Sequence, residues 1–252
     1  MSGQWIDIEA NDGVSFSGYL STPRGGKGPG IVLCQEIFGV NPYIQSVADY
    51  YAEEGYVVLA PDLFWRINPG IQLGYTEKDF ERAFQLFGQF DTDQGMNDIS
   101  ASVKTLRFRP EVVGKVGALG FCLGGRLAYL AAARSGVDCA VAYYGVTIDE
   151  YLNEASNINV PMALHFAEND QFAPMASVNN IQAALKDHVE TKIFIYPGVD
   201  HGFSRNESVH FHKSTAQLAH QRSIALFRKT MGPHYDFSQL WDKHCEYEFA
   251  TR

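Results

Sequence analysis

The feature that most constrains the fold is a glycine-flanked cysteine between an apolar run and an Ala/Leu-rich run. The motif Gly120-Phe121-Cys122-Leu123-Gly124 matches the nucleophile-elbow pattern with cysteine in place of serine. Its two glycines let a strand turn abruptly into a helix without Cβ clashes. Cys122 would then lie at a helix N-terminus, where free amides and the helix dipole favour a thiolate. A buried cysteine beside two packing glycines is the alternative for such a motif on its own.

Apolar runs of strand length alternate with amphipathic runs of helix length along most of the chain. Strands are expected at 14–20, 31–34, 56–60, 115–121, 137–144, 160–166 and 192–196, and helices at 42–54, 76–90, 93–108, after Cys122, from Pro174 to about 187, and at 209–231. Strands that alternate with helices usually form a parallel sheet between two helical layers. The pattern therefore predicts the α/β class, with a mostly parallel sheet covered by helices on both faces.

Length and charge narrow the class of protein further. The 252 residues fit one large domain, because α/β folds of this size often remain undivided. We expect residues 1–232 to form a single catalytic domain and residues 233–252 a C-terminal tail to which no structure is assigned. The net charge is −9 and no basic run occurs, so a nucleic acid is not an expected partner.

The sequence also bears on the compartment and on cofactors. The N-terminus does not resemble a signal peptide, and no apolar run is long enough to cross a bilayer. The four cysteines, Cys34, Cys122, Cys139 and Cys245, are far apart and form no C-x-x-C pair, which argues against a zinc site and a disulfide framework. We therefore expect a cytoplasmic protein without a membrane partner, a metal or another cofactor. The oligomeric state is left open.

Asp170 and His201, which follow later in the chain, complete a candidate catalytic triad with Cys122. Asp170 follows the expected strand at 160–166, and His201 follows the one at 192–196. In folds with this elbow the order is nucleophile, acid, histidine, and ligands bind at the carboxyl ends of the strands. Glu168 is the alternative acid, and each residue alone would also suit an ordinary loop. The helix at 209–231, which contains His210, His212 and His220, should cover the outside of the sheet.

The segment after the strand at 31–34 should complete the site. A tetrahedral oxyanion needs two N–H donors, and the amides of Leu123 and Ile37 are the expected pair. Glu36 is unusual beside such a site, because its carboxylate would oppose the developing charge. The Glu36 side chain either points away into solvent or has a function in the site. Arg205, four residues after His201, is available to neutralise its charge.

Together these residues resemble the dienelactone hydrolase family, whose members have the α/β-hydrolase fold and a Cys-His-Asp triad. The matching segments are Gln35-Glu36-Ile37-Phe38-Gly39-Val40-Asn41, Pro61-Asp62-Leu63, Gly120-Phe121-Cys122-Leu123-Gly124-Gly125, Tyr143-Tyr144-Gly145-Val146 and His201-Gly202-Phe203-Ser204-Arg205. They span about residues 5–230 of the chain. The tail after Gly232 lies outside the resemblance.

The resemblance implies hydrolysis of the enol lactone of dienelactone through an acyl-cysteine. It implies that Glu36 interacts with the nucleophilic thiol and activates it. It also implies that Arg205 binds the substrate carboxylate and pairs with Glu36. Tyr144, in one of the matching segments, is predicted to contact the substrate.

One expected helix departs from the family, which has a second carboxylate-binding arginine there. Phe80, Ala83, Phe84 and Phe87 fall at i, i+3, i+4 and i+7 and share one face. Alignment of the helix places Phe80 at the position of that arginine. Arg82 is about 200° round the helix from Phe80, at ~100° per residue, so it faces away. The phenylalanines either form a substrate pocket that is more apolar than that of the family or belong to the ordinary core.

We therefore predict a hydrolase of lactones or small carboxylic esters that acts on a small-molecule substrate. A general carboxylesterase or thioesterase with the same triad is the first alternative. A ligand-binding protein that keeps the fold without turnover is the second. A redox-sensing thiol at Cys122 is the third, and it would need a resolving cysteine such as Cys34. The natural substrate and its pathway are not determined by the sequence.

Overall fold

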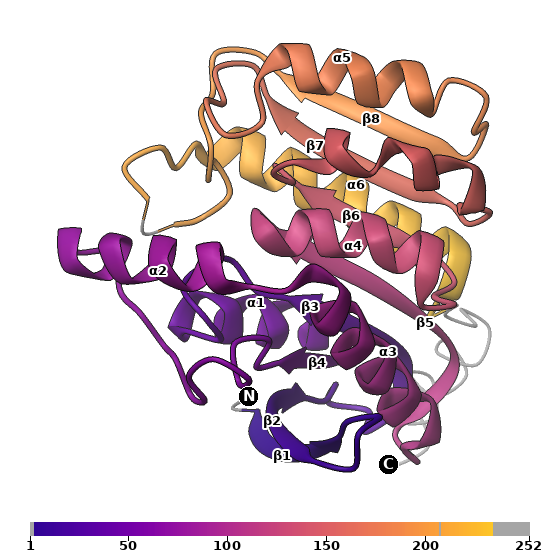
Figure 1. The fold of residues 1–252 in the computed structure, drawn as a ribbon. Coiled ribbons are helices and arrows are strands. Elements are labelled where there is room, and N and C mark those ends of the chain that lie inside the picture. Colours follow the sequence, from indigo (N-terminus) through magenta and orange to yellow (C-terminus); the bar gives the residue numbers. More distant parts are fainter. Residues whose placement is uncertain (1–2, 207, 234–252) are drawn as a thin grey trace, which may run out of the picture.

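The computed structural model describes residues 3–206 and 208–233, whose strands form one eight-stranded sheet (Figure 1). The strands are β1 (Gln4–Glu9), β2 (Ser15–Ser21), β3 (Gly28–Cys34), β4 (Val57–Pro61), β5 (Val112–Phe121), β6 (Ala140–Tyr143), β7 (Met162–Ala167) and β8 (Thr191–Tyr196). Their order is β1-β2-β4-β3-β5-β6-β7-β8. The pairings of β1 with β2 and of β2 with β4 are antiparallel, and the remaining pairings are parallel. The predicted α/β fold is confirmed.

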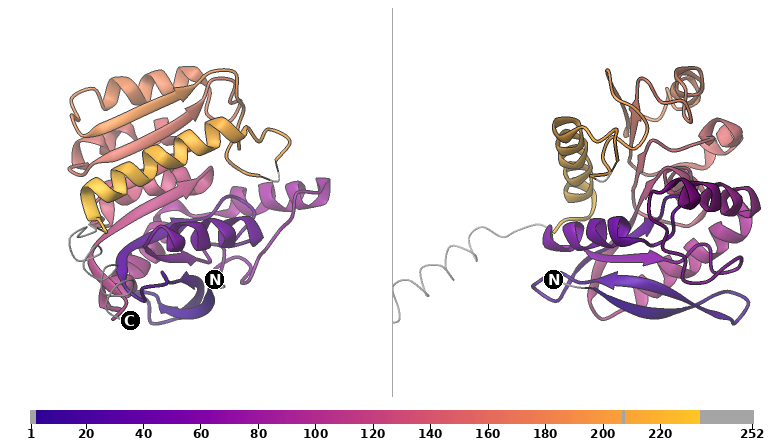
Figure 2. Two further views of the ribbon diagram at one scale, coloured as in Figure 1. Left: turned by 180° about the vertical axis from the view of Figure 1, so that it is seen from behind. Right: turned by 90° about the vertical axis from the view of Figure 1, so that its left-hand side faces the viewer.

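Helices cover both faces of this sheet. They are α1 (Pro42–Glu53), α2 (Glu77–Gln89), α3 (Thr92–Phe108), α4 (Leu123–Arg134), α5 (Met175–Ala184) and α6 (Lys213–Met231), with a 3₁₀ segment η1 (Ile148–Asn157). Helices α1 and α6 lie on one face, and α3, α4 and α5 lie on the other (Figure 2). No helix in the described part of the chain is long and apolar enough to span a bilayer.

Central strands are buried on both sides, which explains their continuous apolar sequences. All seven residues of β3 and all five of β4 are buried, as parallel strands between two helical layers must be. By contrast, the edge strand β1 was not expected from the sequence. Most of its side chains are at least partly exposed, so it lacks the apolar run that reveals an inner strand.

Some element boundaries differ from the predictions. Helix α6 begins at Lys213 rather than at residue 209. The amide of Phe211 instead donates to the carbonyl of Ser208, and that of His212 donates to Phe203, so this segment is a loop. Helix α5 ends at Ala184, before the expected 187, and η1 was not expected. Apart from Pro233, the predicted tail at 233–252 lies outside the described residues, and the division into domain and tail stays a prediction.

The sheet brings the candidate residues to one edge. Strands β3, β5, β6, β7 and β8 are neighbours and run parallel, so their carboxyl ends lie side by side. Glu36, Cys122, Asp170 and His201 follow β3, β5, β7 and β8 respectively. Helix α2 extends beyond the same edge (Figure 1). This edge is therefore where a binding site can form.

Candidate active site

The chain turns sharply at Cys122, as the glycine motif predicts. Cys122 lies between β5 and α4 with φ 56° and ψ −116°, a conformation that L-residues rarely adopt. A Cβ atom on Gly120 would lie 1.9 Å from the carbonyl oxygen of Gly124, and one on Gly124 would lie 2.1 Å from that of Cys34. Only glycine fits at both positions. The turn leaves Cys122 lining a cavity while 8% exposed.

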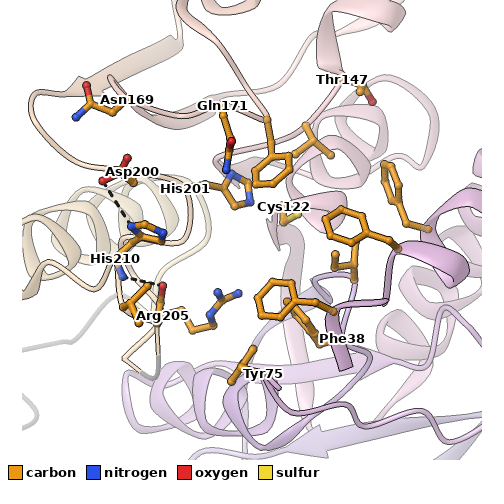
Figure 3. Close-up of a pocket in the computed structure, with 18 residues that line it drawn as sticks. Phe38, Tyr75, Cys122, Thr147, Asn169, Gln171, Asp200, His201, Arg205 and His210 are labelled. Atoms are coloured by element: carbon orange, nitrogen blue, oxygen red, sulfur yellow. Dashed lines mark hydrogen bonds and ion pairs between the residues drawn. The ribbon is translucent and has the colours of Figure 1, made fainter. Parts of the chain in front are cut away.

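Asp170 and His201 are paired beside this cysteine. Nδ1 of His201 lies 2.7 Å from Oδ2 of Asp170, whose other carboxylate oxygen accepts from the amides of Phe172 and Ala173 at 2.8 and 3.0 Å. Figure 3 shows the ring of His201 beside the sulfur of Cys122. The alternative acid, Glu168, instead accepts from the amide of Gly198 at 2.9 Å. The geometry therefore assembles the three candidate triad residues.

The environment of His201 favours its charged form. Burial alone lowers the pKa of His201, but the charge of Cys122 and the hydrogen-bonded carboxylate of Asp170 outweigh burial and raise the pKa to about 10. An imidazolium therefore persists as long as a thiolate lies beside it. Such a pair holds both a nucleophile and a proton for a leaving group.

Glu36 does not point into solvent. Nη1 of Arg205 donates to Oε2 of Glu36 at 3.0 Å, and both side chains are buried. The charge of Glu36 outweighs the effect of burial and raises the pKa of Arg205 above its usual value. The guanidinium lies 4.5 Å from the ring centroid of Tyr75 and 5.3 Å from that of Phe38, and it lines the cavity (Figure 3). The structure thus places the buried guanidinium of Arg205 at the cavity wall.

Tyr144 is not where a substrate contact was expected. It is 0% exposed and is absent from the cavity wall. Its φ of 36° turns the ring inward, where it packs against Phe203 and His201 at centroid distances of 5.5 and 4.8 Å. Its hydroxyl lies 2.9 Å from Oγ of Ser204 and donates a long, 3.5 Å contact to Glu36. Tyr144 therefore packs behind His201 and Glu36 rather than at the cavity wall, and its contact with the substrate stays a prediction.

The cavity has a volume of about 580 Å³ and a largely aromatic wall. Phe80, Phe84 and Phe87 from α2 line it, and Phe80 packs edge-on against Phe38 with centroids 5.0 Å apart. Arg82 does not line it and donates to Gln85 at 3.2 Å on the exposed side of α2. A capping box between Thr76 and Asp79 fixes where this helix begins. The three phenylalanines thus form a wall of the cavity rather than ordinary core.

Sequence reasoning missed several cavity residues. Phe172, two positions after the acid, packs edge-on against His201 at 5.1 Å and meets Phe84 at 6.3 Å across the mouth. His210 was expected in a helix outside the sheet, but it lines the cavity and lies 3.5 Å from a carboxylate oxygen of Asp200 (Figure 3). The position of Phe172 beside Asp170 was a usable signal. No local signal identified His210, because its placement depends on how residues 208–212 fold back.

The two predicted oxyanion donors lie next to the nucleophile. Leu123 is the first residue of α4, so its amide has no partner four residues earlier. Ile37 lines the cavity, and no protein acceptor within residues 3–206 and 208–233 takes a hydrogen bond from its amide. Neither amide has a protein acceptor among the described residues, and their role as oxyanion donors stays a prediction.

The remaining described cysteines are unsuited to redox chemistry with Cys122. Cys34 and Cys139 are buried, and burial raises the pKa of each thiol to about 12. Cys245 lies outside the described residues. In the part of the chain that the structure describes, no three His, Cys, Asp or Glu side chains are grouped to hold a metal ion.

Comparisons with known proteins point to one family. The model of the dienelactone hydrolase family matches residues 16–231. A carboxymethylenebutenolidase of Pseudomonas putida is 34% identical over 225 residues, 89% of this chain and 95% of that protein. Carboxymethylenebutenolidase 1 of Cupriavidus pinatubonensis is 31% identical, covering 92% of this chain and all of that protein. Among solved structures, a dienelactone hydrolase-like promiscuous phosphotriesterase from metagenomic libraries shares the fold with a TM-score of 0.77 at 20% identity, over 92% of this chain and 100% of that one.

Proposed function

This chain belongs to the dienelactone hydrolase family and is a hydrolase of that kind, and we propose that it cleaves lactones or small carboxylic esters through an acyl-cysteine on Cys122. The observation that carries the proposal is the arrangement of the triad. Nδ1 of His201 lies 2.7 Å from the buried Asp170, and the other side of the ring meets a cysteine on a strained elbow. These are the roles that nucleophilic catalysis requires at one place.

In the proposed first step, the Cys122 thiolate attacks the ester carbonyl carbon and forms a C–S bond. The amides of Leu123 and Ile37 bind the resulting oxyanion. As the intermediate collapses, the C–O bond to the leaving group breaks, and the His201 imidazolium gives it a proton. In a lactone the leaving group stays attached to the acyl chain.

In the second step, water hydrolyses the acyl-cysteine. Neutral His201 takes a proton from the water, whose oxygen attacks the thioester carbonyl. The C–S bond then breaks and restores the thiolate and imidazolium. Asp170 keeps the ring of His201 oriented in both steps, since its own position is fixed by the amides of Phe172 and Ala173.

Glu36 and Arg205 are proposed to act together. Arg205 has one nitrogen committed to Glu36, while Nε is buried without a protein partner among the described residues. The remaining donors suit a substrate carboxylate, because guanidinium groups bind carboxylates with paired hydrogen bonds. Glu36, which the resemblance assigns to thiol activation, holds this guanidinium at the cavity wall through its carboxylate.

The aromatic wall bears on which acyl groups fit. Phe80, Phe84 and Phe87 offer apolar surface where a second cation was expected. We propose one carboxylate anchor rather than two, weaker preference for anionic lactones, and better turnover of neutral or aromatic esters. This same feature favours the alternative of a general carboxylesterase or thioesterase.

The buried thiols Cys34 and Cys139 support a reducing, cytoplasmic setting.

A substrate panel tests the proposal. Lactones, oxygen esters and thioesters, each with and without a carboxylate, are hydrolysed by the wild type and by Cys122→Ala. We expect loss of turnover in Cys122→Ala with an unchanged circular dichroism spectrum, and a mass increase of one acyl group on Cys122 when the wild type is quenched during turnover. A variant with Cys34, Cys139 and Cys245 replaced together should keep most activity if it folds. Near-wild-type hydrolysis by Cys122→Ala would refute the nucleophile assignment.

A further inference from the structure

A buried arginine lies one helical turn after the nucleophile, outside the machinery described above. Arg126 is the fourth residue of α4 and is 6% exposed. Its backbone amide donates to the carbonyl of Cys122 at 3.3 Å, which fixes the two residues on successive turns. Its side chain does not reach the cavity, but it contacts the wall from behind.

The hydrogen bonds of this guanidinium are made to neutral groups. Nη1 donates to Oγ1 of Thr147 at 2.7 Å, and Nη2 donates to Oγ1 of Thr92 at 3.3 Å. Nε has no partner within the described ranges. No described carboxylate forms an ion pair with Arg126, whereas Arg134 on the same helix pairs with Asp93 and Glu154.

This placement opposes two ordinary preferences. Burying a charge without an opposite charge is costly, and a cation in the first turn of a helix opposes the helix dipole. Violations of such rules tend to occur where a function compensates them. A negative charge at Cys122 would be that compensation, because the thiolate and the later oxyanion form at the same helix end.

The titratable groups around Arg126 fit this interpretation. Cys122, at the N-terminus of the same helix, and Glu150 and Tyr151 of η1 interact with it electrostatically, and burial lowers its pKa. The rings of Phe87 and Tyr151 lie 5.5 and 5.7 Å from its guanidinium carbon. Of the charged groups named here, the exposed Glu150 is the one carboxylate.

The charges of the site also balance with Arg126. A triad with its thiolate and imidazolium formed carries two negative charges and one positive charge. Glu36 and Arg205 cancel one another. The guanidinium of Arg126 then brings the buried site to neutrality before substrate enters.

We propose that Arg126 is a positioning residue whose buried positive charge stabilises the Cys122 thiolate and the oxyanion formed from it. The inference rests on the proposed function of Cys122. It concerns the charge of Arg126, not only its hydrogen bonds. Through Thr147, which lines the cavity with a left-handed φ of 52°, Arg126 also holds the wall in place, so the two roles must be separated.

Three variants separate them. Arg126→Gln removes the charge, Arg126→Lys keeps the charge but cannot reach both threonines, and Arg134→Gln removes an arginine charge from the far end of the same helix. The readouts are the pH dependence of Cys122 alkylation by iodoacetamide, which needs no substrate turnover, and kcat/KM for a neutral ester. Circular dichroism and thermal unfolding report the fold.

For Arg126→Gln we expect the alkylation midpoint to rise by about one pH unit, a tenfold smaller thiolate fraction at neutral pH, with kcat/KM lower by about tenfold. Arg126→Lys should keep the midpoint even if its Tm falls, and Arg134→Gln should change neither readout. A folded Arg126→Gln variant with the wild-type midpoint overturns the proposal. So does a folded Arg126→Lys variant with a raised midpoint, which decides the matter if Arg126→Gln does not fold. Absence of an acyl adduct on wild-type Cys122 would instead refute the proposed function.

Discussion

Nη1 of Arg205 donates to Oε2 of Glu36 at 3.0 Å across 169 residues of sequence. The Arg205 side chain is 9% exposed and that of Glu36 is 1% exposed. The pair joins the loop after β3 to the loop after β8, the same two loops that carry Ile37 and His201. The ion pair therefore links the two loops from which the proposed site is built.

Replacing Arg205 should affect both binding and stability. In Arg205→Met, KM for carboxylate-bearing substrates should rise by a factor equivalent to ~1.5–3 kcal/mol, the worth of a charged hydrogen bond, with little change for neutral esters. The unpaired buried Glu36 should also lower the free energy of unfolding by about 3–5 kcal/mol. Adding Glu36→Gln should restore most of the stability without restoring carboxylate recognition. Steady-state kinetics and urea unfolding measure the two effects, and a single variant unchanged in both would contradict the assignment.

Glu36→Gln alone tests whether this carboxylate tunes the thiol. Glutamine keeps the shape and can still accept from Arg205, so the change is mainly one of charge. Acylation of Cys122 should slow, and the pH dependence of its alkylation should move. Glu168→Gln is the matched control, because its carboxylate accepts from Gly198 on a neighbouring loop and lies outside the triad. An alkylation profile identical to that of the wild type would leave Glu36 with a structural role.

The aromatic wall predicts a gain of function. Phe80→Arg should place a second arginine side chain in the cavity. The ratio of kcat/KM for anionic over neutral substrates should then rise by about tenfold, because one charged hydrogen bond contributes ~1.5 kcal/mol. Arg82→Ala should change that ratio little, because Arg82 points away from the cavity. If Arg82→Ala impairs carboxylate substrates as much as Arg205→Met does, the assignment of the helix face is wrong.

Glycine at the elbow should be irreplaceable. In Gly124→Ala the new methyl group would lie 2.1 Å from the carbonyl oxygen of Cys34, and both atoms belong to rigid, buried elements. We expect a loss of more than about 4 kcal/mol in unfolding free energy or failure to fold. Gly88→Ala is the control, since nothing lies within 4 Å of its added Cβ and alanine in a helix should stabilise by about 0.5–1 kcal/mol. Thermal and urea unfolding of both variants measure the contrast.

Two histidines between α6 and the sheet predict loss of stability in acid. His220 contacts the hydroxyls of Tyr51 and Tyr143 at 3.1 and 3.3 Å, and burial lowers its pKa from 6.5 to about 4. Burial also lowers the pKa of His165 well below its usual value. The unfolded chain therefore takes up protons near pH 6.5 while the folded protein does not, so stability should fall as the pH drops from there towards 4.

Unfolding measured across this pH range should show a shallower decline for His220→Gln. His188→Gln, in a turn after α5, is the control and should leave the slope unchanged. A wild-type stability that is flat between pH 6.5 and 4 would contradict the role assigned to these histidines.

The sequence by itself determined the features that local chemistry dictates. The spacing of Gly120 and Gly124 imposes the strand–turn–helix at Cys122, because the clashes that exclude other residues occur within that turn and its neighbouring strand. Buried parallel strands reveal themselves as continuous apolar runs, and their alternation with helices predicted the sheet. The order of Cys122, Asp170 and His201 along these strands then placed all three at one sheet edge. The helical spacing of Phe80, Phe84 and Phe87 placed them on one face.

Only the tertiary structure decided which way side chains point where the chain leaves a regular element. Tyr144 follows a strand in a matching segment, yet its positive φ turns the ring into the core. His210 was expected on a helix, yet its loop folds back over the cavity because nearby amides bond to Ser208 and Phe203. Arg126 bonds to two threonines and pairs with no described carboxylate, which depends on how α3 and η1 pack against α4. Hydrophobic periodicity shows on which face of a helix or strand a residue lies. These three outcomes depend instead on contacts between segments far apart in the sequence.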